Sequence, residues 1–164
     1  MRSPVRFDQR APRAARRTGT QVIVLDANLL LYAYVRELPF HAEASRWLAQ
    51  VFSEEPLVGI PWQSIGAFMR VSTHKRLSAG DASVDRVLSI VDSWLRLANV
   101  RLLVPGEKHW PILRDMILRG QVHGPRVTDA QLAALTIEHG GILHSTDRDF
   151  ARFPGLRWVN PLNP

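Results

Sequence analysis

The chain has 164 residues and no cysteine, which excludes disulfides, zinc–thiolate sites and a thiol nucleophile. Hydrophobic residues make up 46% of the sequence, enough for the core of one ordinary domain. No apolar run is long enough to cross a bilayer, and no signal-peptide core follows the charged N-terminus, so we expect a cytoplasmic protein.

The formal net charge of +6 is concentrated at the N-terminus. Residues 1–20 hold six arginines and one aspartate, a balance of +5, so residues 21–164 carry only +1. We predict a basic, disordered arm at 1–20 and a single domain at 21–164. The arm is either a tether for an RNA backbone, acting by counterion release, or a leader from an upstream start or a vector. We prefer the second interpretation.

After residue 20, the sequence alternates between short apolar runs and longer amphipathic patterns. Short apolar runs bounded by breakers are typical of buried strands, whereas apolar residues at i, i+3, i+4 and i+7 are typical of helices. The apolar residues from Ala44 to Val51 have this helical spacing. Gly140 is a strong stop signal for the late helix that begins at Asp129. We predict strands at 22–25, 100–104, 142–145 and 156–159. Between the first two strands, we predict four helices: at 28–35, from Pro39, from Pro61 to Thr73 and from Val84 to Leu95. Two more helices, at 108–119 and from Asp129 to His139, are predicted between the second and third strands.

Alternating strands and helices are the pattern of a parallel sheet covered by helices on both faces. We therefore predict an α/β fold, a three-layer α/β/α sandwich with a central, mainly parallel sheet. The connections at 74–81 and 121–126 are predicted to be loops, the second of them basic.

Three aspartates stand at strand ends or at a helix start. Asp26 follows the strand at 22–25, Asp147 follows the strand at 142–145, and Asp129 lies in the first turn of the late helix. Ligands of parallel α/β sheets bind beyond the carboxyl ends of the strands. Carboxylates gathered there repel one another unless a cation neutralises them, and Mg²⁺ prefers oxygen ligands. The pattern indicates a metal-dependent enzyme that acts on phosphates.

Each candidate also has a purely structural interpretation. A single aspartate after a strand is often a turn residue or a helix cap, and only the three together favour metal ligands. Asp149 is either a site acid or a cap for the turn at Phe150. Asn28 is either a support for the first aspartate or a helix-start residue, and Thr128 is predicted to be an N-cap. The histidines lack metal-ligand spacing, and the tryptophans are assigned to core or interface positions rather than to base stacking.

Four motifs, in this order and spacing, resemble the PIN domain and, more narrowly, the toxin ribonucleases of VapBC toxin–antitoxin pairs. The resemblance covers about residues 22–162. The motifs are Leu25–Ala33, His41–Leu48, Val127–Ala134 and Thr146–Phe150.

The resemblance implies a domain, usually a homodimer, whose acidic pocket binds Mg²⁺ or Mn²⁺ and hydrolyses RNA phosphodiesters. A water activated by the metal would leave 5′-phosphate and 3′-hydroxyl ends. The resemblance also implies a cognate, VapB-like antitoxin that covers hydrophobic surface on the helices at 29–34 and 47–52. By this resemblance, the expected catalytic residues are Asp26, Asp129 and Asp147, and the expected metal ligands are the same three together with Asp149. The expected supporting residues are Asn28 and Thr146. The expected RNA contacts are Arg126 and Arg148.

The chain departs from the family pattern at one point. The family usually has a glutamate at or next to Ala67, but the sequence from Trp62 to Arg70 contains no acid. Gln63 would then supply a neutral oxygen, or water would take the position. A catalytically degenerate PIN-like module that binds RNA or antitoxin is therefore the alternative function, and a DNA-directed nuclease would share the same pocket.

Overall fold

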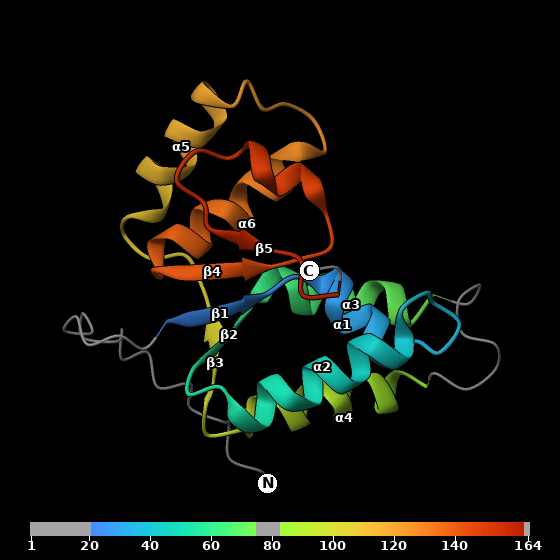
Figure 1. Ribbon diagram of the computed structural model, residues 1–164. Coiled ribbons are helices and arrows are strands. Elements are labelled where there is room, and N and C mark those ends of the chain that lie inside the picture. Colours follow the sequence, from blue (N-terminus) through green and yellow to red (C-terminus); the bar gives the residue numbers. More distant parts are fainter. Residues whose placement is uncertain (1–20, 75–82, 163–164) are drawn as a thin grey trace, which may run out of the picture.

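The computed structural model describes residues 21–74 and 83–162 (Figure 1). Within these ranges, the strands form one sheet in the order β3-β2-β1-β4-β5, and every neighbouring pair is parallel. The arm predicted at 1–20 lies outside the described residues, as does most of the loop predicted at 74–81. The strands are β1 (Val22–Leu25), β2 (Val58–Pro61), β3 (Val100–Leu103), β4 (Gly141–His144) and β5 (Trp158–Val159).

Helices cover both faces of this sheet. Four of them, α1 to α4, lie on one face, while α5 and α6 lie on the other (Figure 1). The predicted three-layer α/β/α sandwich with a parallel sheet is confirmed. None of the helices in the described ranges is long and apolar enough to span a membrane. The helices are α1 (Ala27–Tyr34), α2 (His41–Glu54), α3 (Trp62–Ser72), α4 (Val84–Leu95), α5 (His109–Arg119), α6 (Arg126–Glu138) and the 3₁₀ helix η1 (Arg148–Arg152).

The central strand β1 contributes to two cores, because successive side chains of a strand point to opposite faces. Ile23 and Leu25 pack into the core formed with α1 to α4, whereas Val24 packs into the core formed with α5 and α6. Both faces of the strand are therefore buried, and its position in the sheet is fixed from two sides.

Two predicted features differ from the structure. Strand β2 was not predicted, because its four residues Val58–Pro61 are buried on both faces and include a glycine and a proline, so no alternation marks them. Helix α6 begins at Arg126 rather than at Asp129, with Pro125 at its N-cap. Thr128 consequently lies inside the first turn and is not the N-cap, since the proline with its φ of −58° already starts the helical turn.

The hydrophobic surface is also distributed differently from the prediction. Leu29 and Leu30 are completely buried in the core, and Tyr34 is the one large hydrophobic residue that is more than a third exposed in the segments 29–34 and 47–52, which the antitoxin was predicted to cover. Exposed apolar side chains occur instead at Phe40 before α2 and on the outer side of α4. On α4 these are Val84, Leu88 and Leu95, while Val87, Val91 and Trp94 of the same helix are buried.

Candidate active site

The candidate site lies at the carboxyl edge of the sheet, the edge at which the parallel strands end. The register pairs Leu25 of β1 with His144 of β4, so the next residues, Asp26 and Ser145, lie side by side. Backbone hydrogen bonds continue the sheet through both residues, from Asp26 N to His144 O and from Ser145 N to Val159 O. The sheet itself therefore fixes the backbone of the site.

Asp26 is held at both carboxylate oxygens. As the N-cap of α1, it accepts a hydrogen bond from Ala27 N at Oδ1 (2.6 Å), and Oδ2 accepts one from Ser145 Oγ (2.6 Å). Burial nevertheless raises the pKa of Asp26 from 3.8 to about 6, because both hydrogen bonds together do not offset the loss of water, and the charges of Asp147 and Asp129 raise it further. A cation bound at this site would therefore strongly favour the ionised form of Asp26.

Ser145 connects the residues of this edge. It is completely buried, and its Oγ donates to Asp26 while accepting from Asn28 Nδ2 (2.9 Å) and from Asp147 N (3.0 Å). This set uses the whole hydrogen-bonding capacity of a hydroxyl group. The prediction from the sequence placed the hydroxyl at Thr146 and omitted Ser145. The alternation of β4, in which Leu143 and the residue two positions later are both buried, is the signal that identifies it.

Asn28 lies beside the first aspartate, as expected for a supporting residue. Its Nδ2 is bound to Ser145, but Oδ1 is buried and accepts no hydrogen bond from any described residue. A buried acceptor without a donor is unfavourable, and a water or a cation at the site would satisfy it. Asn28 therefore offers a neutral oxygen next to the carboxylate.

Asp147 and Asp149 lie at the start of η1, beyond β4. Asp147 is the N-cap of this 3₁₀ helix, and its Oδ1 accepts from Asp149 N (2.8 Å). Asp149 lies 3.9 Å from Arg152 Nη2, and both aspartates are exposed. Asp147 therefore caps η1, whereas the side chain of Asp149 faces Arg152 from the first turn of η1.

Asp129 reaches the same group from α6. Burial raises its pKa, with further contributions from the charges of Asp147 and Asp149, while Arg126 and Arg152 act in the opposite direction. The structure therefore brings the predicted aspartates within electrostatic range of one another and places two arginines beside them. Arg148, also predicted to contact RNA, is exposed in η1.

The donors at this edge are oxygens, as a hard divalent cation requires. The pKa values of Asp26 and Asp129 are raised partly by neighbouring carboxylates, a repulsion that a cation would relieve. In the described ranges, no group of three or more carboxylate or imidazole side chains is arranged to hold a metal as it stands. The donor chemistry fits a metal, and closing the carboxylates around one requires side-chain movement.

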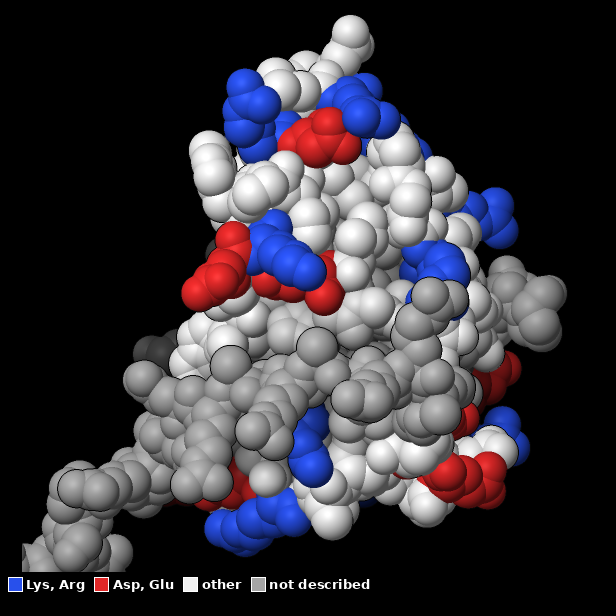
Figure 2. Space-filling view, turned by 90° about the vertical axis from the view of Figure 1, so that its left-hand side faces the viewer, with Lys and Arg blue, Asp and Glu red and all other residues white. Residues whose placement is uncertain are grey.

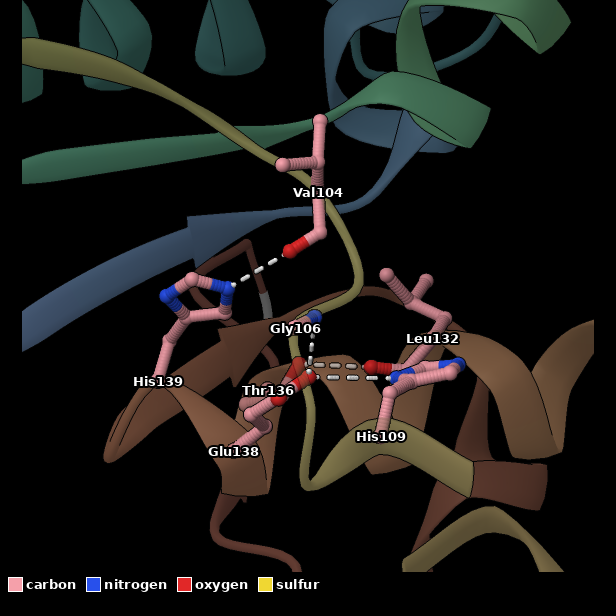
Figure 3. Close-up of polar contacts among 7 residues, drawn as sticks. All are labelled: Val104, Gly106, His109, Leu132, Thr136, Glu138 and His139. Atoms are coloured by element: carbon pink, nitrogen blue, oxygen red, sulfur yellow. Dashed lines mark hydrogen bonds and ion pairs between the residues drawn. The ribbon is translucent and has the colours of Figure 1, made fainter. Parts of the chain in front are cut away.

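The opposite, amino edge of the sheet carries a separate polar cluster. Figure 2 views the molecule from that side and shows acidic and basic side chains next to one another. Figure 3 shows that Glu138, the last residue of α6, accepts from Gly106 N (3.2 Å) and lies 3.4 Å from His109 Nδ1, while His139 contacts Val104 O (3.1 Å). These contacts join the end of α6 to the connection between β3 and α5, away from the candidate site.

Comparison with protein families identifies the domain. Residues 23–156 match the PIN domain. The chain belongs to the PIN domain family. This match includes β1, the start of α6 and the segment after β4, which are the three parts that carry the aspartates of the site.

Relatives of this PIN domain are VapC proteins. "Ribonuclease VapC33" of Mycobacterium tuberculosis is 34% identical over 141 residues, which is 86% of this chain and 99% of the relative. "Ribonuclease VapC37" of the same species is 35% identical, over 84% of this chain and 96% of the relative. The resemblance to the VapC proteins of VapBC pairs is confirmed.

Solved structures show the same fold at lower sequence identity. A VapBC2 complex from Rickettsia felis, bound to a promoter DNA fragment, matches with a TM-score of 0.63 and 14% identity, over 85% of this chain and 98% of the other. VapC20 of Mycobacterium tuberculosis, a sarcin-ricin loop cleaving toxin, matches with a TM-score of 0.59 and 19% identity, over 82% and 98% of the two chains. At these identities, the match concerns the fold.

Proposed function

We propose that this PIN domain is a metal-dependent endoribonuclease and the toxin of a toxin–antitoxin pair. The main observation is the aspartate group at the carboxyl edge, in which Asp26 is held at both oxygens and has a pKa of about 6. A carboxylate kept this far from water, beside other carboxylates, is typical of a functional site rather than of a stabilising contact. The relatives named as ribonucleases support the RNA-directed activity.

The proposed cofactor is Mg²⁺, with Mn²⁺ as the other candidate. Asp26, Asp129 and Asp147 would hold it, with Asp149 as a fourth acid and Asn28 Oδ1 as a neutral oxygen. A bound divalent cation supplies the Lewis acidity that hydrolysis of a phosphodiester by water requires. Water as the nucleophile gives products with 5′-phosphate and 3′-hydroxyl ends.

Residues around the metal site would position the Asp26 carboxylate and bind the RNA substrate. Ser145 and Ala27 N fix the Asp26 carboxylate, so it keeps its geometry before the substrate arrives. Arg126, the first residue of α6, and Arg148 in η1 are exposed near the acids and would bind phosphates of the RNA. Their positive charges would hold the anionic substrate next to the carboxylates.

The proposed partner is a VapB-like antitoxin. Solved structures with this fold include VapBC complexes, among them one from Rickettsia felis. In the described part of the chain, exposed apolar residues on α4 and around Phe40 give such a partner hydrophobic surface to cover. A homodimer, the usual state of the family, stays a prediction that light scattering of the purified chain would test.

Cleavage of total RNA and a tRNA panel by the purified protein tests the proposed activity. With Mg²⁺ or Mn²⁺, we expect discrete fragments with 5′-phosphate ends, abolished by EDTA and by Asp26→Ala or Asp129→Ala. Asp115→Ala is the matched control, because Asp115 is an exposed aspartate of α5 paired with Arg119. DNA of the same sequence, included in parallel, would reveal a DNA-directed nuclease.

A degenerate binding module is the second candidate. It is favoured by the sequence of α3, which has no acid at or near the half-buried Ala67. Folded protein, free of antitoxin, that binds RNA or metal but cleaves no RNA in the panel would contradict the nuclease and establish this alternative.

A further inference from the structure

Trp62 is an exposed tryptophan that the fold does not use in its core. Its relative exposure is 56%, whereas Trp94 is 1% exposed and packs against Phe68 and Tyr34. Trp158 is half-buried and its indole nitrogen donates to Ser145 O. Trp62 makes no aromatic ring contact with another described residue. The stability of the core therefore does not explain a tryptophan at this position.

The sheet places Trp62 at the carboxyl edge, one strand away from Asp26. The register of β1 and β2 pairs Val24 with Gly59, so Asp26 and Pro61 stand at equivalent levels, two residues further along. Trp62 follows Pro61 directly and is the first residue of α3. Adjacent strands lie about 4.8 Å apart, so the backbone that carries this exposed indole lies near the backbone of the candidate catalytic residue Asp26.

The surroundings of Trp62 suit a nucleotide. The first turn of α3 contains no acid, and its N-cap, Pro61, gives no side-chain hydrogen bond. The first turn of α3 therefore has no acid of its own against the positive end of the helix dipole, which favours a ligand that carries phosphate. An exposed indole binds single-stranded bases by stacking, which needs no particular base because every base has a π-face.

We propose that Trp62 is the stacking platform for an unpaired RNA base beside the phosphate that is cleaved. This inference rests on the proposed ribonuclease function and adds a substrate requirement to it. The substrate must present a single-stranded nucleotide next to the cleavage position, because a base inside a duplex is already stacked on both faces. Trp62 thus selects loops and single-stranded segments of RNA over continuous helices.

The chain offers a matched control in Trp110. This residue is 65% exposed, as the second residue of α5. It follows His109, which contacts Glu138 at the amino edge, so Trp110 lies away from the candidate site. Substitution of Trp110 removes a similar exposed indole without changing the carboxyl edge.

The test measures binding of a labelled RNA oligonucleotide that the wild type cleaves. Binding is compared in a cleavage-silenced Asp129→Asn background with Trp62→Ala, Trp62→Phe or Trp110→Ala added. We expect Trp62→Ala to raise the Kd roughly 5- to 100-fold, as loss of one stacked base does, and Trp62→Phe to retain most of the affinity. Trp110→Ala should leave the Kd unchanged. With Asp129 restored, Trp62→Ala should raise KM more than it lowers kcat.

Abasic nucleotides introduced one at a time distinguish stacking from a structural role. At one position beside the cleavage site, the abasic substitution should weaken binding by the protein that has Trp62 and cause no further loss with Trp62→Ala. Equal affinities with and without Trp62, from a wild type that cleaves RNA, would overturn the stacking role and leave the ribonuclease intact. A Trp62→Ala variant that loses antitoxin binding but retains RNA affinity would assign the residue to the protein partner instead. A wild type that neither binds nor cleaves RNA would overturn both.

Discussion

At the scale of single residues, Asp26 shows how the fold maintains an unfavourable group. Its carboxylate ends the central strand, caps α1 and is bonded to Ser145, yet its pKa is raised to about 6 by burial. The folded protein therefore holds a proton on Asp26 at pH values at which the unfolded chain has released it. Ionisation of Asp26 lowers the free energy of unfolding, and a cation bound beside the carboxylate would offset this loss.

This pKa predicts the direction of a stability change with pH. Between about pH 4 and pH 7, the folded state binds more protons at Asp26 than the unfolded state, so the free energy of unfolding should fall as the pH rises. A pKa raised from 3.8 to about 6 corresponds to about 3 kcal/mol over that window. Urea denaturation without metal should show the decline in the wild type and a much flatter profile in Asp26→Asn. Asp115→Asn, at an exposed site, should keep the slope of the wild type; equal slopes in all three proteins would contradict the assignment.

Ser145 gives a second prediction at this scale. Ser145→Ala leaves Asp26 Oδ2 and Asn28 Nδ2 without their partner inside the site, so we expect a loss of about 1–3 kcal/mol in the free energy of unfolding. The pKa of Asp26 should rise further, because the hydrogen bond from Ser145 lowers it. Thr146→Ala should change stability little. A larger loss from Thr146→Ala than from Ser145→Ala would restore the assignment made from the sequence.

At the scale of elements, the end of α6 is tied to the connection that leads from β3 into α5. The Glu138 side chain is only 9% exposed, lies at the N-terminal end of α5 and accepts from Gly106 N (Figure 3). A carboxylate at a helix N-terminus is favourable, and His109, when protonated, adds an ion pair. One side chain of α6 therefore fixes where α5 begins.

We expect Glu138→Ala to lower the free energy of unfolding by about 1–3 kcal/mol, because a buried carboxylate and its partners lose one another. His109→Ala should cost less, and the double variant should cost less than the sum of the two, since the residues share one contact. Thermal and urea unfolding of the four proteins measure this coupling. Additive losses would show that the pair does not interact. RNA cleavage by folded Glu138→Ala should persist, because the cluster lies at the edge opposite Asp26.

At the scale of the whole molecule, a bound metal should appear as added stability. A ligand that binds only the folded state at ten times its Kd adds about 1.4 kcal/mol to the free energy of unfolding. We therefore expect Mg²⁺ or Mn²⁺ to raise the melting temperature of the wild type in a concentration-dependent manner, and to have little effect on Asp26→Ala. A shift of the same size in both proteins would place the cation elsewhere. Calorimetric melts in a metal series, with EDTA as the reference, measure the effect without any RNA.

The sequence predicted those parts of the structure that depend on local patterns. The helical spacing from Val84 to Leu95 predicted the bounds of α4, and the strand-ending position of Asp26 predicted its place at the carboxyl edge. Features set by distant parts of the chain were missed. Strand β2 is defined by neighbours on both sides, and the role of Ser145 depends on contact with a residue 119 positions earlier.

That separation has a consequence for synthesis of the protein. Asp26 is translated early, but the hydroxyl that orients it, and the strand that β1 pairs with on that side, come near the end of the chain. A nascent chain that has been synthesised only up to α5 holds Asp26 without Asp129, Ser145 or Asp147 around it. The aspartate group therefore cannot assemble until the segment that carries β4 and η1 has been synthesised.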